Sequence, residues 1–173
     1  MPKQHIITVY SFEELSSEAQ EKAIDKFRFA NVDYEWWDCV YEMAKEIGIT
    51  IKRFDIDAGI IKGELTTSFL DSFREIRKNW GRGSELHKTA KDYLKQYNKA
   101  YKEWKKNDKE LTLDDFESED EARDIEEDYK RAILEDFLIL LKKEYEYQTF
   151  DETVKEMIID NEYEFEEDGT LYK

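Results

Sequence analysis

Apolar residues that alternate with polar ones predict β-strands in three regions of the chain. Residues 4–10 alternate and are rich in β-branched side chains, which is typical of a strand. The same period of two returns over 49–65, where a Gly-containing turn at 57–59 indicates a β-hairpin. A second hairpin is expected over 163–172, with its turn at Asp168-Gly169.

A period of three to four residues predicts helices between these strands. Ser17, Ser118 and Thr149 each precede an acidic or amide residue by three positions, which is the pattern of a capping box at a helix start. Gly48 ends a stripe that includes Trp36 and Trp37, so both tryptophans are expected to be partly buried. Helices are expected over 17–30, 33–47, 68–80, 84–107, 118–147 and 149–158.

The order of these elements indicates an α+β fold. We expect a small antiparallel sheet, made of the N-terminal strand and the two hairpins, packed against five or six helices. The helices of 84–107 and 118–147 would form a long helical hairpin. The length, and 40% hydrophobic residues, favour a single domain of residues 1–173 with one core.

The charge of the chain lies almost entirely in its last third. Residues 1–110 carry 20 basic and 20 acidic side chains, whereas residues 111–173 carry 7 basic and 23 acidic ones, so this part holds the whole formal charge of −16. Residues 77–109 have the opposite character, with eleven Lys and Arg against four acids. Such a field acts on partners and association rates rather than on the fold.

The predicted helix of 84–107 carries lysines at helical spacing on one face, namely Lys88, Lys91, Lys95, Lys99, Lys102 and Lys106. These could contact a nucleic-acid backbone, and the aromatic residues beside them could stack on bases. We favour pairing within the chain, in which Lys91, Lys95 and Lys102 face the carboxylates of 114–128 in an antiparallel helical pair. Direct nucleic-acid binding is therefore not expected.

The sequence offers no convincing catalytic or metal site. Cys39 is expected to be a buried structural thiol, and His5 and His87 lie far from it in the sequence, with His87 expected to be exposed. The motif of 55–59 lacks residues that a calcium loop needs, so it is better explained as a hairpin turn. The carboxylates of 114–121 are expected to be a solvated face. We therefore expect no enzyme activity, no metal and no cofactor.

Two stretches resemble a group of small acidic proteins that bacteriophages and prophages encode. They are Tyr10-Ser11-Phe12-Glu13-Glu14-Leu15, continuing to Ala23, and Asp33-Tyr34-Glu35-Trp36-Trp37. The endings Asn161-Glu162-Tyr163-Glu164-Phe165 and Asp168-Gly169, with segments near 63–65 and 88–91, extend the similarity over nearly the whole chain. The resemblance is to a family without an assigned activity. It implies a phage context, in which small acidic proteins commonly inhibit host defences.

Together, charge and resemblance predict a non-enzymatic inhibitor that binds a nucleic-acid-binding protein of host defence, such as a CRISPR effector, through a surface that imitates nucleic acid. The expected location is the cytoplasm of a bacterial host, since no apolar run is long enough for a membrane span and no signal segment is visible. Two alternatives stay open: an antitoxin-like or assembly partner that binds through an apolar patch, and a phage enzyme. The residues expected to contact the partner are Glu144, Glu146, Glu162, Glu164, Glu166 and Glu167.

Overall fold

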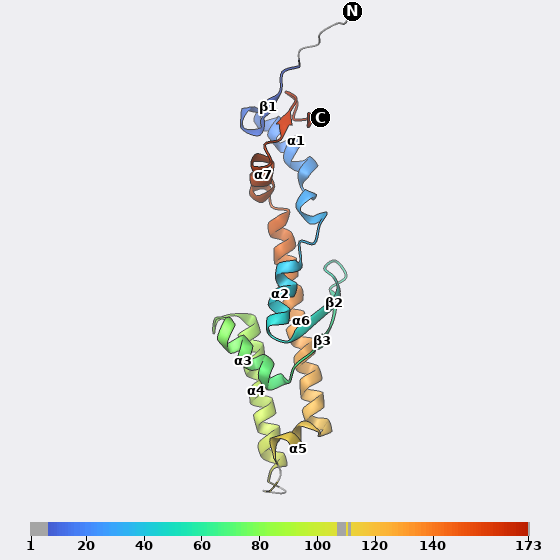
Figure 1. Cartoon of the computed structure of the whole chain (residues 1–173), viewed down its shortest axis with the longest axis vertical. Coiled ribbons are helices and arrows are strands. Elements are labelled where there is room, and N and C mark those ends of the chain that lie inside the picture. Colours follow the sequence, from blue (N-terminus) through green and yellow to red (C-terminus); the bar gives the residue numbers. More distant parts are fainter. Residues whose placement is uncertain (1–6, 107–109, 111, 173) are drawn as a thin grey trace, which may run out of the picture. The chain divides into compact units, whose positions relative to one another are not determined.

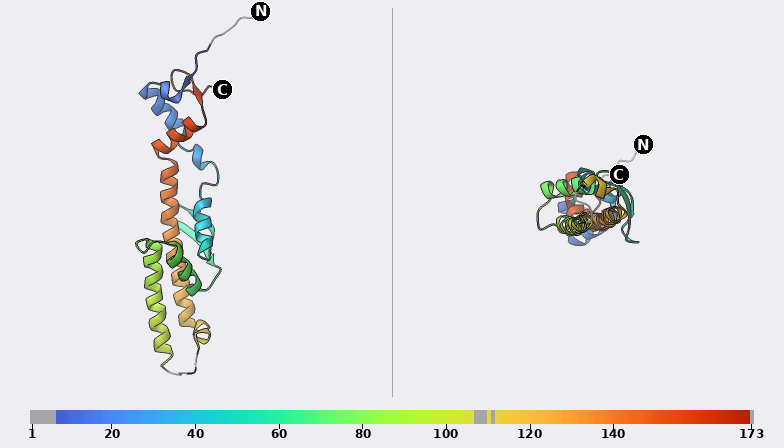
Figure 2. Two further views of the ribbon diagram at one scale, coloured as in Figure 1. Left: turned by 60° about the vertical axis from the view of Figure 1, so that its left-hand side comes forward. Right: turned by 90° about the horizontal axis from the view of Figure 1, so that it is seen from below.

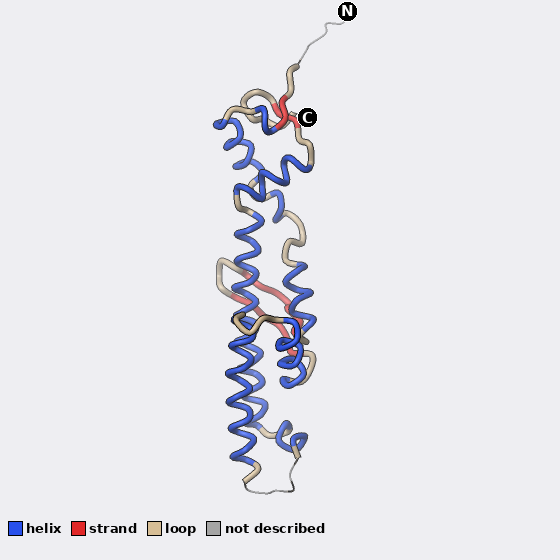
Figure 3. Tube along the Cα trace, turned by 90° about the vertical axis from the view of Figure 1, so that its left-hand side faces the viewer, coloured by secondary structure: helices blue, strands red, loops and turns tan. Residues whose placement is uncertain are grey.

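The computed structural model describes residues 7–106, 110 and 112–172. Within them the fold is α+β, as predicted, with seven α-helices, two 3-10 helices and two antiparallel pairs of short strands (Figures 1 and 3). The single small sheet that we expected is not formed. The N-terminal strand pairs with the C-terminal one, while the central hairpin forms a separate sheet.

The chain forms two compact units. The terminal unit consists of residues 1–37 and 143–173, and the central unit consists of residues 38–142. Helix α6 (Asp120–Gln148) contributes residues to both. The expected single domain stays a prediction, because two compact parts of one chain can still unfold together.

The terminal unit joins the two ends of the chain through strands β1 (Tyr10–Ser11) and β4 (Glu164–Phe165). Tyr10 pairs with Phe165, and Phe165 also bridges to Leu171, so the expected C-terminal hairpin is present in a shortened form. The expected strand of 4–10 is confirmed only at Tyr10: residues 4–6 lie outside the described part, and residues 7–9 are not in a strand. The remaining elements are η1 (Phe12–Glu14), α1 (Ser17–Phe27), η2 (Ala30–Val32) and α7 (Asp151–Asp160).

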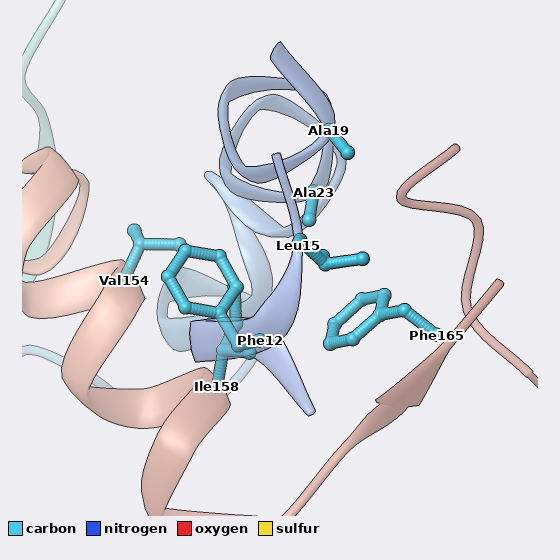
Figure 4. Close-up of a cluster of buried hydrophobic side chains, with 7 residues drawn as sticks. All are labelled: Phe12, Leu15, Ala19, Ala23, Val154, Ile158 and Phe165. Atoms are coloured by element: carbon cyan, nitrogen blue, oxygen red, sulfur yellow. The ribbon is translucent and has the colours of Figure 1, made fainter. Parts of the chain in front are cut away.

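A small hydrophobic core holds these elements together (Figure 4). Phe12 and Phe165 approach edge to face, with ring centroids 6.3 Å apart, and Ile158 of α7 packs beside them. Ala19 and Ala23 allow α1 to approach closely, because they carry almost no side-chain volume. The buried members are Phe12, Leu15, Ala19, Ala23, Val154, Ile158 and Phe165.

The central unit contains the predicted hairpin, now β2 (Ile49–Asp55) and β3 (Ile60–Leu65), with a bulge between Ile51 and Arg53. The Asp55 carboxylate accepts a hydrogen bond from the backbone N–H of Ala58, which confirms a hairpin turn at this motif. The helices are α2 (Asp38–Glu46), α3 (Phe69–Asn79), α4 (Glu85–Trp104), α5 (Leu113–Glu117) and most of α6.

Aromatic side chains form the centre of this second core. The ring of Phe69 lies 4.7 Å from Tyr129 and 5.2 Å from Tyr97, and Tyr97 lies 5.2 Å from Phe116. These four residues come from α3, α4, α5 and α6, so one cluster ties these four helices of the central unit together. The aromatic positions of α4 are therefore core contacts rather than stacking platforms.

Helices α4 and α6 lie side by side, as predicted (Figures 1 and 2), and Tyr93 contacts Tyr129 at 5.9 Å. The ion pairs that we expected between them are not formed by the three named lysines. Lys95 pairs with Asp92 of its own helix, and neither Lys91 nor Lys102 has an ion pair among the described residues. The reason is geometric: aromatic residues occupy the interface, so these lysines are turned to solvent.

Several helix starts differ from the predicted capping boxes. Ser16 rather than Ser17 caps α1, accepting a hydrogen bond from the N–H of Ala19. Ser118 ends α5, since its hydroxyl donates to the carbonyl of Asp115, and Thr149 donates to the carbonyl of Tyr145 at the end of α6. At the first site the neighbouring serine takes the cap position. At Ser118 and Thr149 the hydroxyl instead bonds to a carbonyl at the end of the preceding helix.

The structure starts the second predicted helix later than expected. Trp36 and Trp37 precede α2 and are half-buried, as predicted. Met43 of α2 is exposed. Ser68 and Ser84 cap α3 and α4 as expected, although Asn107, the predicted end of the latter, lies outside the described residues.

Candidate functional site

The six glutamates that the sequence singled out all belong to the terminal unit, but they lie at two places. Glu144 and Glu146 are on the last turns of α6, where Glu144 is half-buried and accepts a hydrogen bond from the side chain of Gln148 at 2.8 Å. The other four, Glu162, Glu164, Glu166 and Glu167, are exposed and flank or belong to β4.

The structure brings two further glutamates to the second place. Glu13 and Glu14 of η1 line one groove together with Glu162 and Glu164, because the pairing of β1 with β4 puts these segments side by side. Glu14 and Glu167 also line a neighbouring groove. We call Glu13, Glu14, Glu162, Glu164, Glu166 and Glu167 the acidic face. Sequence reasoning missed the first two, since nearly 150 residues separate them from the rest.

The carboxylate of Glu14 is held in place by a capping box. Its Oε2 accepts hydrogen bonds from the backbone N–H of Ser11 at 2.9 Å and from the Ser11 hydroxyl at 3.0 Å. The backbone bond, followed by the hydroxyl bond, lowers the pKa of Glu14 below its usual value. This carboxylate is therefore a fixed negative charge at neutral pH.

The two basic side chains of the terminal unit that form ion pairs among the described residues, Lys22 and Arg28, contact other carboxylates. Lys22 pairs with Asp168 at 2.5 Å, and this contact, with hydrogen bonds from Thr170, holds the pKa of Asp168 well below its usual range. Arg28 pairs with Asp25 and with Asp151. Among the described residues, no ion pair involves any member of the acidic face.

Charge divides unequally between the two units. The terminal unit has seven Lys and Arg against 18 Asp and Glu, a formal charge of −11, whereas the central unit has 20 against 25, a charge of −5. Within the central unit, the eleven basic residues of 77–109 partly offset the acidic start of α6. The acidic face has no comparable basic segment in its own unit. Its negative charge is therefore less neutralised than that of the acidic start of α6.

The remaining candidate residues show no catalytic arrangement. Cys39 is exposed in the first turn of α2, and His87 is buried, so both expectations about them were wrong. The buried residues of α2 are Val40 and Ala44, so Cys39 lies off the buried face, whereas Leu86 and His87 in the first turn of α4 are both buried. His5 lies outside the described residues, and within the described part no group of three or more His, Cys, Asp or Glu could hold a metal ion.

The search for membrane spans found no helix among the described residues that is long and apolar enough to cross a bilayer. Comparison with protein families, with curated proteins and with solved structures found no significant match.

Proposed function

We propose that this protein is a non-enzymatic inhibitor of bacteriophage type, which acts in the bacterial cytoplasm on a nucleic-acid-binding protein of host defence, such as a CRISPR effector. The acidic face would occupy the basic groove of that protein and imitate the phosphates of its nucleic acid. The observation that carries the proposal is the acidic face itself: six exposed or fixed carboxylates gathered on a unit of charge −11, with no ion pair among the described residues.

The physical reason is electrostatic complementarity. A nucleic-acid groove is lined with Arg and Lys already arranged for a polyanion, so carboxylates can form charge-assisted hydrogen bonds with the same side chains. A net charge of −16 would also steer the protein toward a basic partner and raise the association rate. Neither effect requires a catalytic residue or a bound cofactor.

A plaque assay in a strain with an active CRISPR system tests this proposal. Expression of the wild-type protein should restore plaque formation by a targeted phage. The triple variant Glu164→Lys, Glu166→Lys, Glu167→Lys should lose this effect and should no longer compete with nucleic acid for the purified effector. The fold should survive, because exposed charges contribute little to stability, about 0–1 kcal/mol per pair.

A matched control separates the acidic face from net charge alone. The triple variant Glu119→Lys, Glu121→Lys, Asp124→Lys changes the charge equally, at exposed positions of the central unit that lie just before α6 and in its first turns. It should keep full inhibition. Equal loss in both variants, or full inhibition by the first one, would contradict the assigned surface.

A second candidate is an antitoxin-like or assembly partner that binds through apolar contacts. It is favoured by exposed aromatic residues of the terminal unit, among them Phe29 and Phe150, each more than half exposed. Salt distinguishes the two candidates, since binding by charge weakens steeply between low and high ionic strength while an apolar interface hardly changes.

A further inference from the structure

The groove beside the acidic face is lined by both apolar side chains and carboxylates. Its volume is about 370 Å³, and it lies between β1 and η1 on one side and the end of α7 with the segment leading to β4 on the other. Apolar and aromatic residues line it, namely Val9, Tyr10, Phe12, Ile158, Ile159 and Tyr163. Four carboxylates join them: Glu13, Glu14, Glu162 and Glu164. No Lys or Arg is among its described lining residues.

Glu162 adopts a left-handed backbone conformation, which non-glycine residues rarely adopt. Its φ is +52°, and it is the one described non-glycine residue with a positive φ. The N–H of Glu162 bonds to the carbonyl of Ile159 and that of Tyr163 to the carbonyl of Ile158, which together make a Schellman motif at the end of α7. Glycine is the usual residue at this point of the motif, because a side chain there strains the backbone.

The turn therefore does not require a glutamate, and a glycine would be more stable. Backbone strain of this kind persists where surrounding structure holds it, often at sites of function. Here the strained residue is one of the glutamates that line the groove. The identity of residue 162 is better explained by its charge than by the fold.

We infer that this groove binds one arginine side chain from an extended, arginine-rich segment of the basic partner. The aliphatic stem and the planar guanidinium would lie against the half-buried rings of Tyr10 and Tyr163, and the guanidinium N–H groups would donate to the carboxylates of Glu162 and Glu164. Arginine fits better than lysine, since its guanidinium stacks on aromatic faces and donates two parallel hydrogen bonds to a carboxylate. This inference rests on the proposed function for the nature of the partner.

Fluorescence anisotropy with labelled octa-arginine tests the inference on the full chain. At 150 mM salt, the double variant Glu162→Gln, Glu164→Gln should bind about tenfold more weakly than the wild type, because charge-assisted hydrogen bonds are lost. The double variant Glu152→Gln, Glu156→Gln carries the same charge change at exposed positions of α7 that do not line the groove. It should bind nearly as tightly as the wild type, and octa-lysine should bind more weakly than octa-arginine.

The variant Glu162→Gly distinguishes a loss of binding from misfolding, because its stability and its affinity should change in opposite directions. This variant should melt about 2 °C higher than the wild type, because the strained position gains its preferred residue, while its affinity for octa-arginine falls. Equal weakening by the two double variants, or equal binding of octa-lysine, would overturn the inference. Either result would mean that only the general field attracts the peptide.

The two proposals fail separately. If octa-arginine binds the groove as expected but the protein does not restore plaque formation, the arginine-binding inference is supported and the inhibitor function is contradicted. The opposite result is that inhibition requires Glu164, Glu166 and Glu167 while the affinity for octa-arginine does not change when Glu162 and Glu164 are replaced. The inhibitor function is then supported and the arginine-binding inference is contradicted.

Discussion

At the scale of single residues, two buried tyrosine hydroxyls of the central unit differ in their partners. The Tyr129 hydroxyl lies 2.6 Å from that of Ser72, whereas the Tyr97 hydroxyl has no hydrogen-bond partner among the described residues. Tyr97→Phe should raise the free energy of unfolding by about 1 kcal/mol, because it removes an unsatisfied buried group. Tyr129→Phe should lower it by about 1–3 kcal/mol, because it leaves Ser72 unpaired. Urea unfolding measures both, and effects of the same sign would contradict this assignment.

At the scale of elements, the β2–β3 hairpin packs against α6 through a glycine. A Cβ atom at Gly63 would lie 2.6 Å from the carbonyl oxygen of Thr50 and 2.8 Å from Cδ2 of Leu134. Gly63→Ala should therefore push β3 away from its partner strand β2 and displace the Leu134 side chain, which lowers the free energy of unfolding by about 1–3 kcal/mol. Gly81→Ala is the control, since a Cβ there meets nothing within 4 Å. Similar denaturation curves for the two variants would show that the hairpin can shift without loss of packing.

At the scale of the whole molecule, stability should depend on pH in two directions. Burial raises the pKa of Glu126 and Asp136, so the native state binds protons more readily than the unfolded chain, and stability should rise as pH falls from 7 toward about 5. The lower pKa values of Glu14, Asp115 and Asp168 act oppositely, so stability should fall below about pH 4. Urea unfolding from pH 3 to 7 measures this profile.

The variant Glu126→Gln isolates one contribution to that profile. Its amide oxygen can still accept the hydrogen bond from the backbone N–H of Phe69, but it has no proton to gain. The rise in stability between pH 7 and 5 should become smaller, while the fall below pH 4 should be unchanged. An unaltered rise would assign the effect to the reduced repulsion of a chain with charge −16.

The sequence by itself determined the class of fold, most helices and the central hairpin. These follow from local rules: periodicity selects the element, and serines such as Ser68 and Ser84 satisfy the first free N–H groups of a helix. It also determined that the charge is segregated, and it singled out Glu162 and Glu164, which line the groove of the terminal unit. Where two hydroxyls compete, as at Ser16 and Ser17, the same rules place the helix start one residue away.

Only the tertiary structure decided which distant segments meet. The pairing of β1 with β4 gathers Glu13 and Glu14 with Glu162 and Glu164, although no local pattern links the two ends of the chain. It also decided that the α4 lysines Lys91 and Lys102 are exposed rather than paired with α6, and that Cys39 is exposed while His87 is buried. The physical reason is that long-range packing is driven by the burial of apolar area, which is non-directional, so charge patterns in the sequence do not determine which faces of two helices meet.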